Sequence, residues 1–151
     1  MPKSVLAQGD WQQALSEMIL TLSGPDFFPA FARGCQLVSG YQSALIVWLS
    51  TAHKPINLYQ DLPEEHAVPS TKPWFDGAYL LDPFYALFTN NAPEGIYRLH
   101  DLAPDNFFES EYYRSYYTQT GLTDECGMLV NLDEDHSILV SLGARGLPEI
   151  S

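Results

Sequence analysis

Aromatic side chains gather in two stretches of the sequence, and carboxylates lie among them. The stretches are residues 74–88 and 107–117, and together they hold Trp74, Phe75, Tyr79, Phe84, Tyr85, Phe88, Phe107, Phe108, Tyr112, Tyr113, Tyr116 and Tyr117. Asp76 and Asp82 lie within the first stretch. Aromatic walls beside carboxylates can hold a ligand cation or a ligand N–H donor. The two stretches therefore predict a cavity for a small polar molecule.

Ordinary packing explains part of this pattern. On a helix, Phe108, Tyr112 and Tyr116 form one stripe. Tyr113 and Tyr117 form an adjoining stripe, so the aromatic face is wider than a core alone requires. Packing against a sheet accounts for at least half of these tyrosines. Each remaining buried phenol needs a hydrogen-bond partner, which the protein, water or a ligand can supply.

Asp82 has two roles open to it. It stands directly before Pro83, which is the ordinary arrangement of a helix N-cap. Capping and ligand contact are about equally favoured for this carboxylate, and neither role excludes the other.

Residues typical of catalysis or metal binding do not cluster in the sequence. The four histidines fall in different expected elements: His53, His66, His100 and His136. His66 follows two glutamates in a proline-rich stretch, but a metal site needs three or four convergent ligands. His100 and Asp101 would point to opposite faces of a strand. Serine-nucleophile, zinc-protease and phosphate-loop signatures are missing, so we expect no enzyme activity, no catalytic residues, no metal and no cofactor.

The composition is that of one acidic globular domain. The chain has 151 residues, seven Lys+Arg against nineteen Asp+Glu and a net charge of −12. This charge repels nucleic acid and anionic membranes. The two cysteines, Cys35 and Cys126, form no C-x-x-C pair, and no apolar run has the length of a signal peptide or a membrane span. We therefore expect a cytoplasmic protein with reduced thiols.

The first half of the chain reads as two helices followed by two strands. Hydrophobic spacing predicts helices over residues 9–23 and 26–38. Residues 43–50 are apolar on both faces and predict a central strand, and residues 56–60 could return antiparallel to it. Residues 61–73 hold three prolines and predict a loop.

The second half alternates between helices and strands. Residues 74–90 predict two helical pieces that separate at Pro83, and residues 95–102 predict a strand. A long aromatic helix is expected over 106–120, closed by Gly121. Residues 125–132 and 136–142 predict a hairpin. About five mostly antiparallel strands with helices on both sides make an α+β sandwich.

Two segments resemble a known family. Trp74-x4-Tyr79-x2-Asp82-Pro83 is similar to a signature in the ligand-binding domain of LuxR-type transcription regulators. The stretch from Phe107 to Gly143, with its FFESEYYRSYY run and GLTDE, resembles the second half of N-terminal sensor domains in LuxR-type regulators that are not tied to lactones. The resemblance implies a PAS/GAF-like sandwich, which agrees with the expected element order.

The resemblance also implies roles for residues. In quorum-sensing members the Trp and Asp of the signature bind the lactone and amide of an acyl-homoserine lactone, and the Tyr lines the pocket. The spacing around Trp74 is shorter than in that pattern, which argues against an acyl-lactone here. Full-length relatives continue into a C-terminal helix-turn-helix domain. We expect residues 1–151 to be the sensor domain alone, with DNA contacted only through such a further domain.

These observations predict a small-molecule sensor. The cavity is expected between one sheet face and the helices at 74–90 and 105–121. Its expected ligand contacts are Tyr59, Trp74, Tyr79, Asp82, Tyr85, Tyr97, Tyr112, Tyr116 and Glu125. Only Arg98 and Arg114 stand out as nearby cations, so an anion would lack a positive partner. We therefore expect a neutral or amine-bearing ligand, no membrane partner, and allow for a homodimer.

Two other functions stay open. The first is a small cofactor-free enzyme that uses His100 or a buried carboxylate, which an open cavity with a converging histidine and carboxylate would favour. The second is a dimerisation module without a ligand, which a pocket filled by side chains would favour.

Overall fold

A single antiparallel sheet organises the chain. The computed structural model describes residues 9–103 and 106–145. The sheet has five strands in the order β2-β1-β5-β4-β3, and every neighbouring pair is antiparallel. The strands are β1 (Ser43–Ser50), β2 (Ile56–Gln60), β3 (Gly95–Arg98), β4 (Leu122–Asn131) and β5 (His136–Arg145). The expected α+β class and the mostly antiparallel sheet are confirmed.

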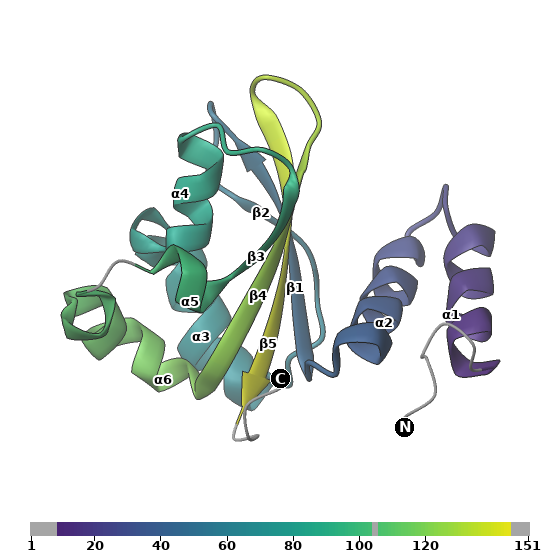
Figure 1. Ribbon diagram of the computed structural model, residues 1–151, viewed down its shortest axis with the longest axis horizontal. Helices are drawn as coiled ribbons and strands as arrows, with labels where there is room; N and C mark the ends of the chain where they lie inside the picture. Colours follow the sequence, from purple (N-terminus) through teal and green to yellow (C-terminus); the bar gives the residue numbers. More distant parts are fainter. Residues whose placement is uncertain (1–8, 104–105, 146–151) are drawn as a thin grey trace.

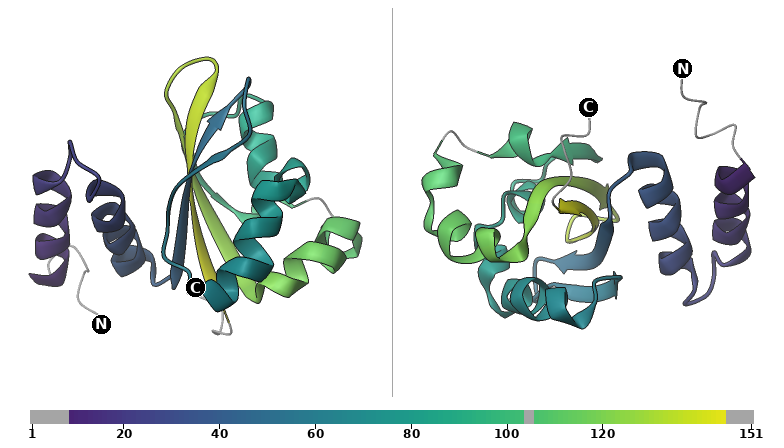
Figure 2. Two further views of the ribbon diagram at one scale, coloured as in Figure 1. Left: turned by 180° about the vertical axis from the view of Figure 1, so that it is seen from behind. Right: turned by 90° about the horizontal axis from the view of Figure 1, so that it is seen from below.

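Helices cover both faces of this sheet, as expected (Figure 1). One face carries α1 (Gly9–Leu20) and α2 (Phe27–Ser39); the other carries α3 (Glu64–Asp76), η2 (Ala78–Leu81), α4 (Pro83–Thr89), α5 (Leu99–Leu102), η3 (Phe107–Glu109), η4 (Tyr113–Tyr117) and α6 (Thr118–Thr120). Both views in Figure 2 show α2 between α1 and the sheet. The molecule is therefore a sandwich with a second, outer helix on one side only.

Each face of the sheet has its own core, because alternate residues of a strand point to opposite faces. Val47 and Leu49 of β1 pack with Trp74, Phe84 and the aromatic residues of the helical side. Ala44 and Ile46 of the same strand pack with Ala32 of α2 on the other face. β1 is thus buried on both faces and paired on both edges, as its uniformly apolar sequence predicted.

The predicted loop over residues 61–73 is wrong. Helix α3 begins at Glu64 and runs through Pro69 and Pro73 to Asp76. Glu64 and Glu65 lie in its first turn, where carboxylates stabilise a helix N-terminus. Its inner side is buried at Ser70, Thr71 and Trp74, so tertiary packing outweighs the hydrogen bonds that the prolines remove.

Several further boundaries differ from the sequence expectation; α1 ends at Leu20 rather than at residue 23, and β4 begins at Leu122 rather than at residue 125. The strand predicted over 95–102 ends at Arg98, and α5 follows because buried Leu99 turns into the core. The helix predicted over 106–120 begins only at residue 111, after the short turn η3. Residues 113–117 then form a π-helical segment. The helix ends as predicted at Gly121, whose φ of 76° is left-handed.

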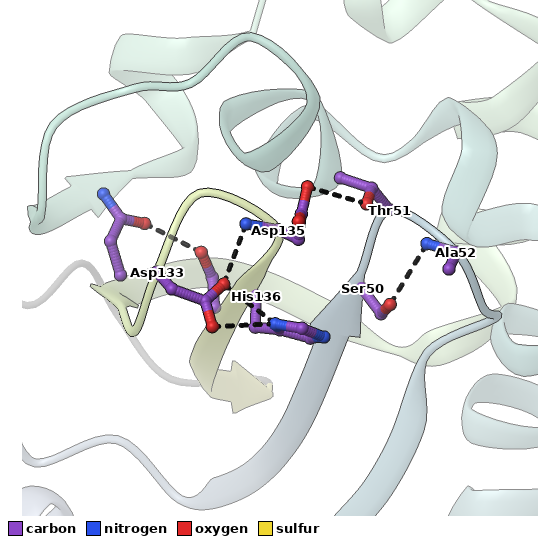
Figure 3. Close-up of polar contacts among 8 residues, drawn as sticks. Ser50, Thr51, Ala52, Asp133, Asp135 and His136 are labelled. Atoms are coloured by element: carbon purple, nitrogen blue, oxygen red, sulfur yellow. Dashed lines mark hydrogen bonds and ion pairs between the residues drawn. The ribbon is translucent and has the colours of Figure 1, made fainter.

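The turn of the β4–β5 hairpin lies beside the end of β1 (Figure 3). Asp133 accepts a hydrogen bond from the backbone N–H of Asp135 at 2.8 Å, and its carboxylate lies 2.8 Å from Nδ1 of His136. The hydroxyl of Thr51, just after β1, donates to the Asp135 carboxylate at 3.2 Å. These bonds fix the acidic turn to the end of β1, so the cluster has a structural role.

Candidate ligand-binding site

An internal cavity of about 60 Å³ lies between the sheet and the helices of the second face. The strands contribute Ser43, Ala44, Leu45, Val47, Leu122, Glu125, Leu139, Ser141, Gly143 and Arg145 to its lining. The helical side contributes Leu62, Ser70, Thr71, Trp74, Asp82, Phe84, Tyr112, Tyr116, Tyr117 and Thr120. The sequence predicted this location, between one sheet face and the two aromatic stretches.

Asp82 is held in the wall of the cavity by donors from the protein. Its carboxylate accepts the indole N–H of Trp74 at 2.7 Å and the backbone N–H of Phe84 at 2.8 Å. The second bond is the N-cap of α4 that the Asp-Pro pair predicted. Burial raises the pKa of Asp82 above its usual range, although Phe84, Trp74 and the nearby Tyr112 hydroxyl lower it. Asp82 thus ties α3 and α4 together as well as lining the cavity.

The aromatic helix supplies three tyrosines to the cavity. Tyr112 and Tyr116 lie four residues apart, and their rings are 5.1 Å apart between centroids. The Tyr116 hydroxyl donates to the backbone carbonyl of Ser70 on α3 at 2.7 Å. A π-helix has a wider turn than an α-helix, so Tyr117 joins the same side. Its buried hydroxyl has no hydrogen-bond partner among the described residues.

Glu125 and Arg145 bring an acidic and a basic side chain to the lining of the cavity. Glu125 accepts the hydroxyl of Ser141 at 2.9 Å. Burial, followed by the charge of Asp82, raises the pKa of Glu125 from 4.5 to about 8. Arg145 donates from Nε to the carbonyl of Thr120 at 3.0 Å and from Nη1 to Ser43 Oγ at 3.0 Å. No ion pair joins Glu125 and Arg145 within the described part of the chain.

The structure brings together five of the nine predicted contact residues. The residues that line the cavity are Trp74, Asp82, Tyr112, Tyr116 and Glu125. The other four, Tyr59, Tyr79, Tyr85 and Tyr97, are not part of its lining.

These four tyrosines lie in other surroundings. Tyr59 on β2 packs against the core of the opposite sheet face. Tyr79 is buried between Trp74 and Tyr85, with ring centroids 5.6 and 4.9 Å away respectively. The Tyr97 hydroxyl donates to the carbonyl of Pro93 at 2.6 Å. Aromatic content alone did not separate packing tyrosines from cavity tyrosines, because it does not report where each side chain points.

Arg145 and Tyr117 line the cavity but are absent from the set predicted from the sequence. The strand was predicted to end at residue 142, whereas β5 continues to Arg145. Strand alternation could have found this arginine, because Leu139, Ser141, Gly143 and Arg145 follow at period two and all line the cavity. The premise that Arg98 and Arg114 are the nearest cations is therefore wrong. Arg98 pairs with Asp124 at 3.5 Å, and Arg114 is exposed.

Two other acidic residues, Asp76 and Asp124, lie outside the cavity lining. Asp76 pairs with Lys72 at 3.1 Å on the surface. Asp124 accepts the Tyr41 hydroxyl at 2.7 Å and pairs with Arg98. Among the residues that the structure describes, no group of three or more His, Cys, Asp or Glu side chains could hold a metal ion.

Comparison with solved structures identifies the fold. The ligand-binding domain of VqsR from Pseudomonas aeruginosa matches with a TM-score of 0.79 and 27% identity, over 93% of this chain and 83% of that one. CepR2 from Burkholderia cenocepacia, an N-acylhomoserine lactone dependent LuxR family transcription factor, matches with a TM-score of 0.64 and 10% identity, over 93% and 79%.

SdiA is a third similar protein. Escherichia coli SdiA matches with a TM-score of 0.64 and 15% identity, over 94% of this chain and 58% of that one. A structure of SdiA in complex with octanoyl-rac-glycerol matches with a TM-score of 0.58 and 14% identity, over 100% and 60%. The chain thus spans less than two thirds of either SdiA chain. A scan against protein-family models and a search of curated proteins both found no match.

These similarities assign an α+β fold with a PAS/GAF-like sandwich. The fold is that of ligand-binding domains of LuxR-type regulators, and the resemblance predicted from the sequence is confirmed at this level. The VqsR and CepR2 neighbours are a ligand-binding domain and a transcription factor rather than enzymes. Within the described residues, no helix has the length and apolar character needed to cross a membrane.

Proposed function

We propose that the chain is the small-molecule-sensing domain of a LuxR-type transcription regulator. The observation that carries this proposal is the cavity, in which carboxylates, an arginine and tyrosine hydroxyls converge between the sheet and the helices. Polar groups of this kind are costly to bury without partners. A ligand that completes their hydrogen bonds explains why they lie together. SdiA in complex with octanoyl-rac-glycerol supports the proposal by analogy.

Ligand binding would act by stabilising one packing of the domain. The cavity joins the ends of β4 and β5 to α3 and to the helical segment over residues 111–120. A molecule that contacts several of these elements favours the arrangement in which they are close together. We propose that this population shift is passed to a C-terminal helix-turn-helix domain, through which DNA would be contacted in the cytoplasm.

The size and polarity of the cavity restrict the ligand. Drug-sized ligands occupy pockets of about 300–1,000 Å³, whereas this cavity measures about 60 Å³. A long acyl chain would require the aromatic walls to move apart. Arg145 removes the premise that an anion would lack a positive partner, but two acidic side chains also line the cavity. We therefore propose a small ligand that bears an amine or is neutral overall.

The small volume also favours a second candidate, a dimerisation module that binds no ligand. In that case the aromatic residues simply fill the core, and the domain regulates through its contacts with another copy. The cofactor-free enzyme gains no such support, since His100 is exposed on α5 and does not line the cavity.

Thermal unfolding with a panel of compounds distinguishes the two candidates. The panel holds small amines, small carboxylates, amino acids, N-octanoyl-homoserine lactone and octanoylglycerol. A sensor gives a rise in Tm with at least one compound, because a ligand that binds only the folded state stabilises it. A dimerisation module gives no rise with any of them, while its Tm increases with protein concentration.

A further inference from the structure

We propose that the cavity binds a small zwitterion, a molecule that carries both an ammonium and a carboxylate group, between Glu125 and Arg145. The ligand carboxylate would contact Arg145 and the Tyr117 hydroxyl, and the ammonium would contact Glu125. This inference rests on the proposed function and names the ligand class for the same cavity.

The side chains of Glu125 and Arg145 each have a polar atom that can still form a hydrogen bond. Glu125 accepts one hydrogen bond, from Ser141 Oγ, at one of its two oxygens. Arg145 donates from Nε and Nη1. Within the described part of the chain, the second oxygen of Glu125 and Nη2 of Arg145 make no hydrogen bond. An acidic and a basic side chain that line one cavity without bonding to each other can each bind one group of a ligand that carries both an ammonium and a carboxylate.

Tyr117 offers a third group that points to a ligand. Its hydroxyl is buried and has no hydrogen-bond partner among the described residues, although it belongs to the cavity lining. A buried polar group without a partner is rare and destabilising. A ligand carboxylate bound at Arg145 would accept a hydrogen bond from this hydroxyl. The cost of burying the hydroxyl without a partner would then disappear.

Asp82 is less suited to hold the ligand, because the protein already uses both of its oxygens. One accepts the Trp74 indole N–H and the other the Phe84 backbone N–H. A ligand amine at this position would compete with the N-cap of α4. Recognition therefore falls to Glu125 and Arg145, which also line the cavity.

The charges favour a zwitterion over a molecule with one charge. An amine alone would meet the Arg145 charge without compensating it, and a carboxylate alone would leave the second oxygen of Glu125 without a hydrogen-bond partner. The cavity of about 60 Å³ is far smaller than the roughly 300–1,000 Å³ of drug-sized sites. It therefore suits one of the smallest amino acids, such as glycine or β-alanine.

Binding of an ammonium would also change the protonation of Glu125. Its pKa of about 8 reflects burial, Asp82 and Asp124, opposed by Ser141 and Arg145. The carboxyl is thus mostly protonated at pH 7 before binding. An ammonium beside it favours the ionised form, so binding should release a proton.

Isothermal titration calorimetry of the purified chain tests these steps. The probes are glycine and β-alanine, with acetate and methylamine as matched molecules of one charge. We expect at least one zwitterion to bind, and the single-charge molecules to bind about tenfold or more weakly, since each lacks one charged hydrogen bond. At pH 7 the heat should depend on the ionisation enthalpy of the buffer, and this dependence should disappear in Glu125→Gln.

Variants locate the site. Glu125→Gln and Arg145→Gln should each weaken zwitterion binding about tenfold or more, while Glu111→Gln and Arg114→Gln, at exposed positions, should leave it unchanged. If Arg145→Gln does not fold, Arg145→Lys keeps the charge and should bind measurably but more weakly than the native chain.

Each contrary result has a separate meaning. Absence of heat with both zwitterions, or equal binding in the native chain and in Glu125→Gln, overturns the zwitterion assignment. If another compound of the panel then raises Tm and Arg145→Lys reduces that rise, the sensor proposal survives without the zwitterion. If no compound of either experiment binds, both proposals fail.

Discussion

Glu125 shares its cavity with a second buried carboxylate, and this placement has a consequence for stability. Its pKa rises from 4.5 to about 8 in the folded state. Between these pH values the folded state keeps a proton that the unfolded chain has released. The free energy of unfolding therefore falls as pH rises through this window. The raised pKa of Asp82 acts in the same direction.

Glu125→Gln should remove the part of this pH dependence of the unfolding free energy that comes from Glu125. The amide has a similar shape and stays neutral, so the variant should match the native chain near pH 4.5 and exceed its stability near pH 8.5. Urea unfolding at several pH values measures the difference. Glu111→Gln, at an exposed position, is the control and should follow the native profile. Parallel profiles for Glu125→Gln and the native chain would contradict the buried position of this carboxyl.

At the scale of the elements, β1 depends on burial of both its faces. Val47 is 1% exposed, and Val47→Asp would place an unpaired charge in the interior at a cost of about 3 kcal/mol or more. Asn57→Asp on β2 is the matched control, because Asn57 is the register partner of Val47 and is exposed. Chemical denaturation compares the two. A Val47→Asp chain with unchanged stability would show that β1 is not a core strand.

The packing of α4 on β4 depends on one glycine. A Cβ at Gly127 would lie 2.5 Å from Cδ1 of Phe84, and this ring is only 1% exposed. Gly127→Ala should therefore destabilise the fold by about 1–3 kcal/mol through overpacking. Gly95→Ala on β3 is the control, because its Cβ would meet Tyr97 at an ordinary 3.7 Å. Equal free energies of unfolding for the two variants would argue against tight helix–sheet contact at this point.

Elements with a clear hydrophobic period were predictable from the sequence. The helices α1 and α2, the strands β1 and β2, and the β4–β5 hairpin are confirmed in place. Helix α3 was not predictable, because its stability comes from contacts of Ser70, Thr71 and Trp74 with distant residues rather than from its own proline-rich sequence. The π segment at Tyr113–Tyr117 also lacks a local signal.

The residues of the cavity likewise divide into those that the sequence predicted and those that it did not. Trp74, Asp82 and Tyr112 were predictable because they stand in dense aromatic stretches. Arg145 was missed because the length of β5 depends on its pairing with β1 and β4. Tyr59 and Tyr97 were included although they lie elsewhere, since residue type alone does not report which sheet face a side chain occupies.

At the scale of the whole molecule, the net charge determines whether the chain binds DNA without a further domain. The net charge of −12 opposes the counterion release that drives phosphate binding. We expect no binding of duplex DNA by the 151-residue chain at physiological salt. A gel-shift assay tests this expectation. Micromolar affinity would contradict an account in which DNA is contacted only through a further domain.

The central claim, that a small molecule binds inside the sandwich, is tested most directly by two-dimensional ¹H–¹⁵N NMR. Spectra of the labelled chain would be recorded during titration with glycine, β-alanine and the other compounds of the panel. The account predicts that one compound shifts the amide signals of Thr120, Ser141 and Gly143, which line the cavity, while signals from α1 stay in place. Spectra that do not change with any compound, or changes confined to α1 and α2, would contradict it.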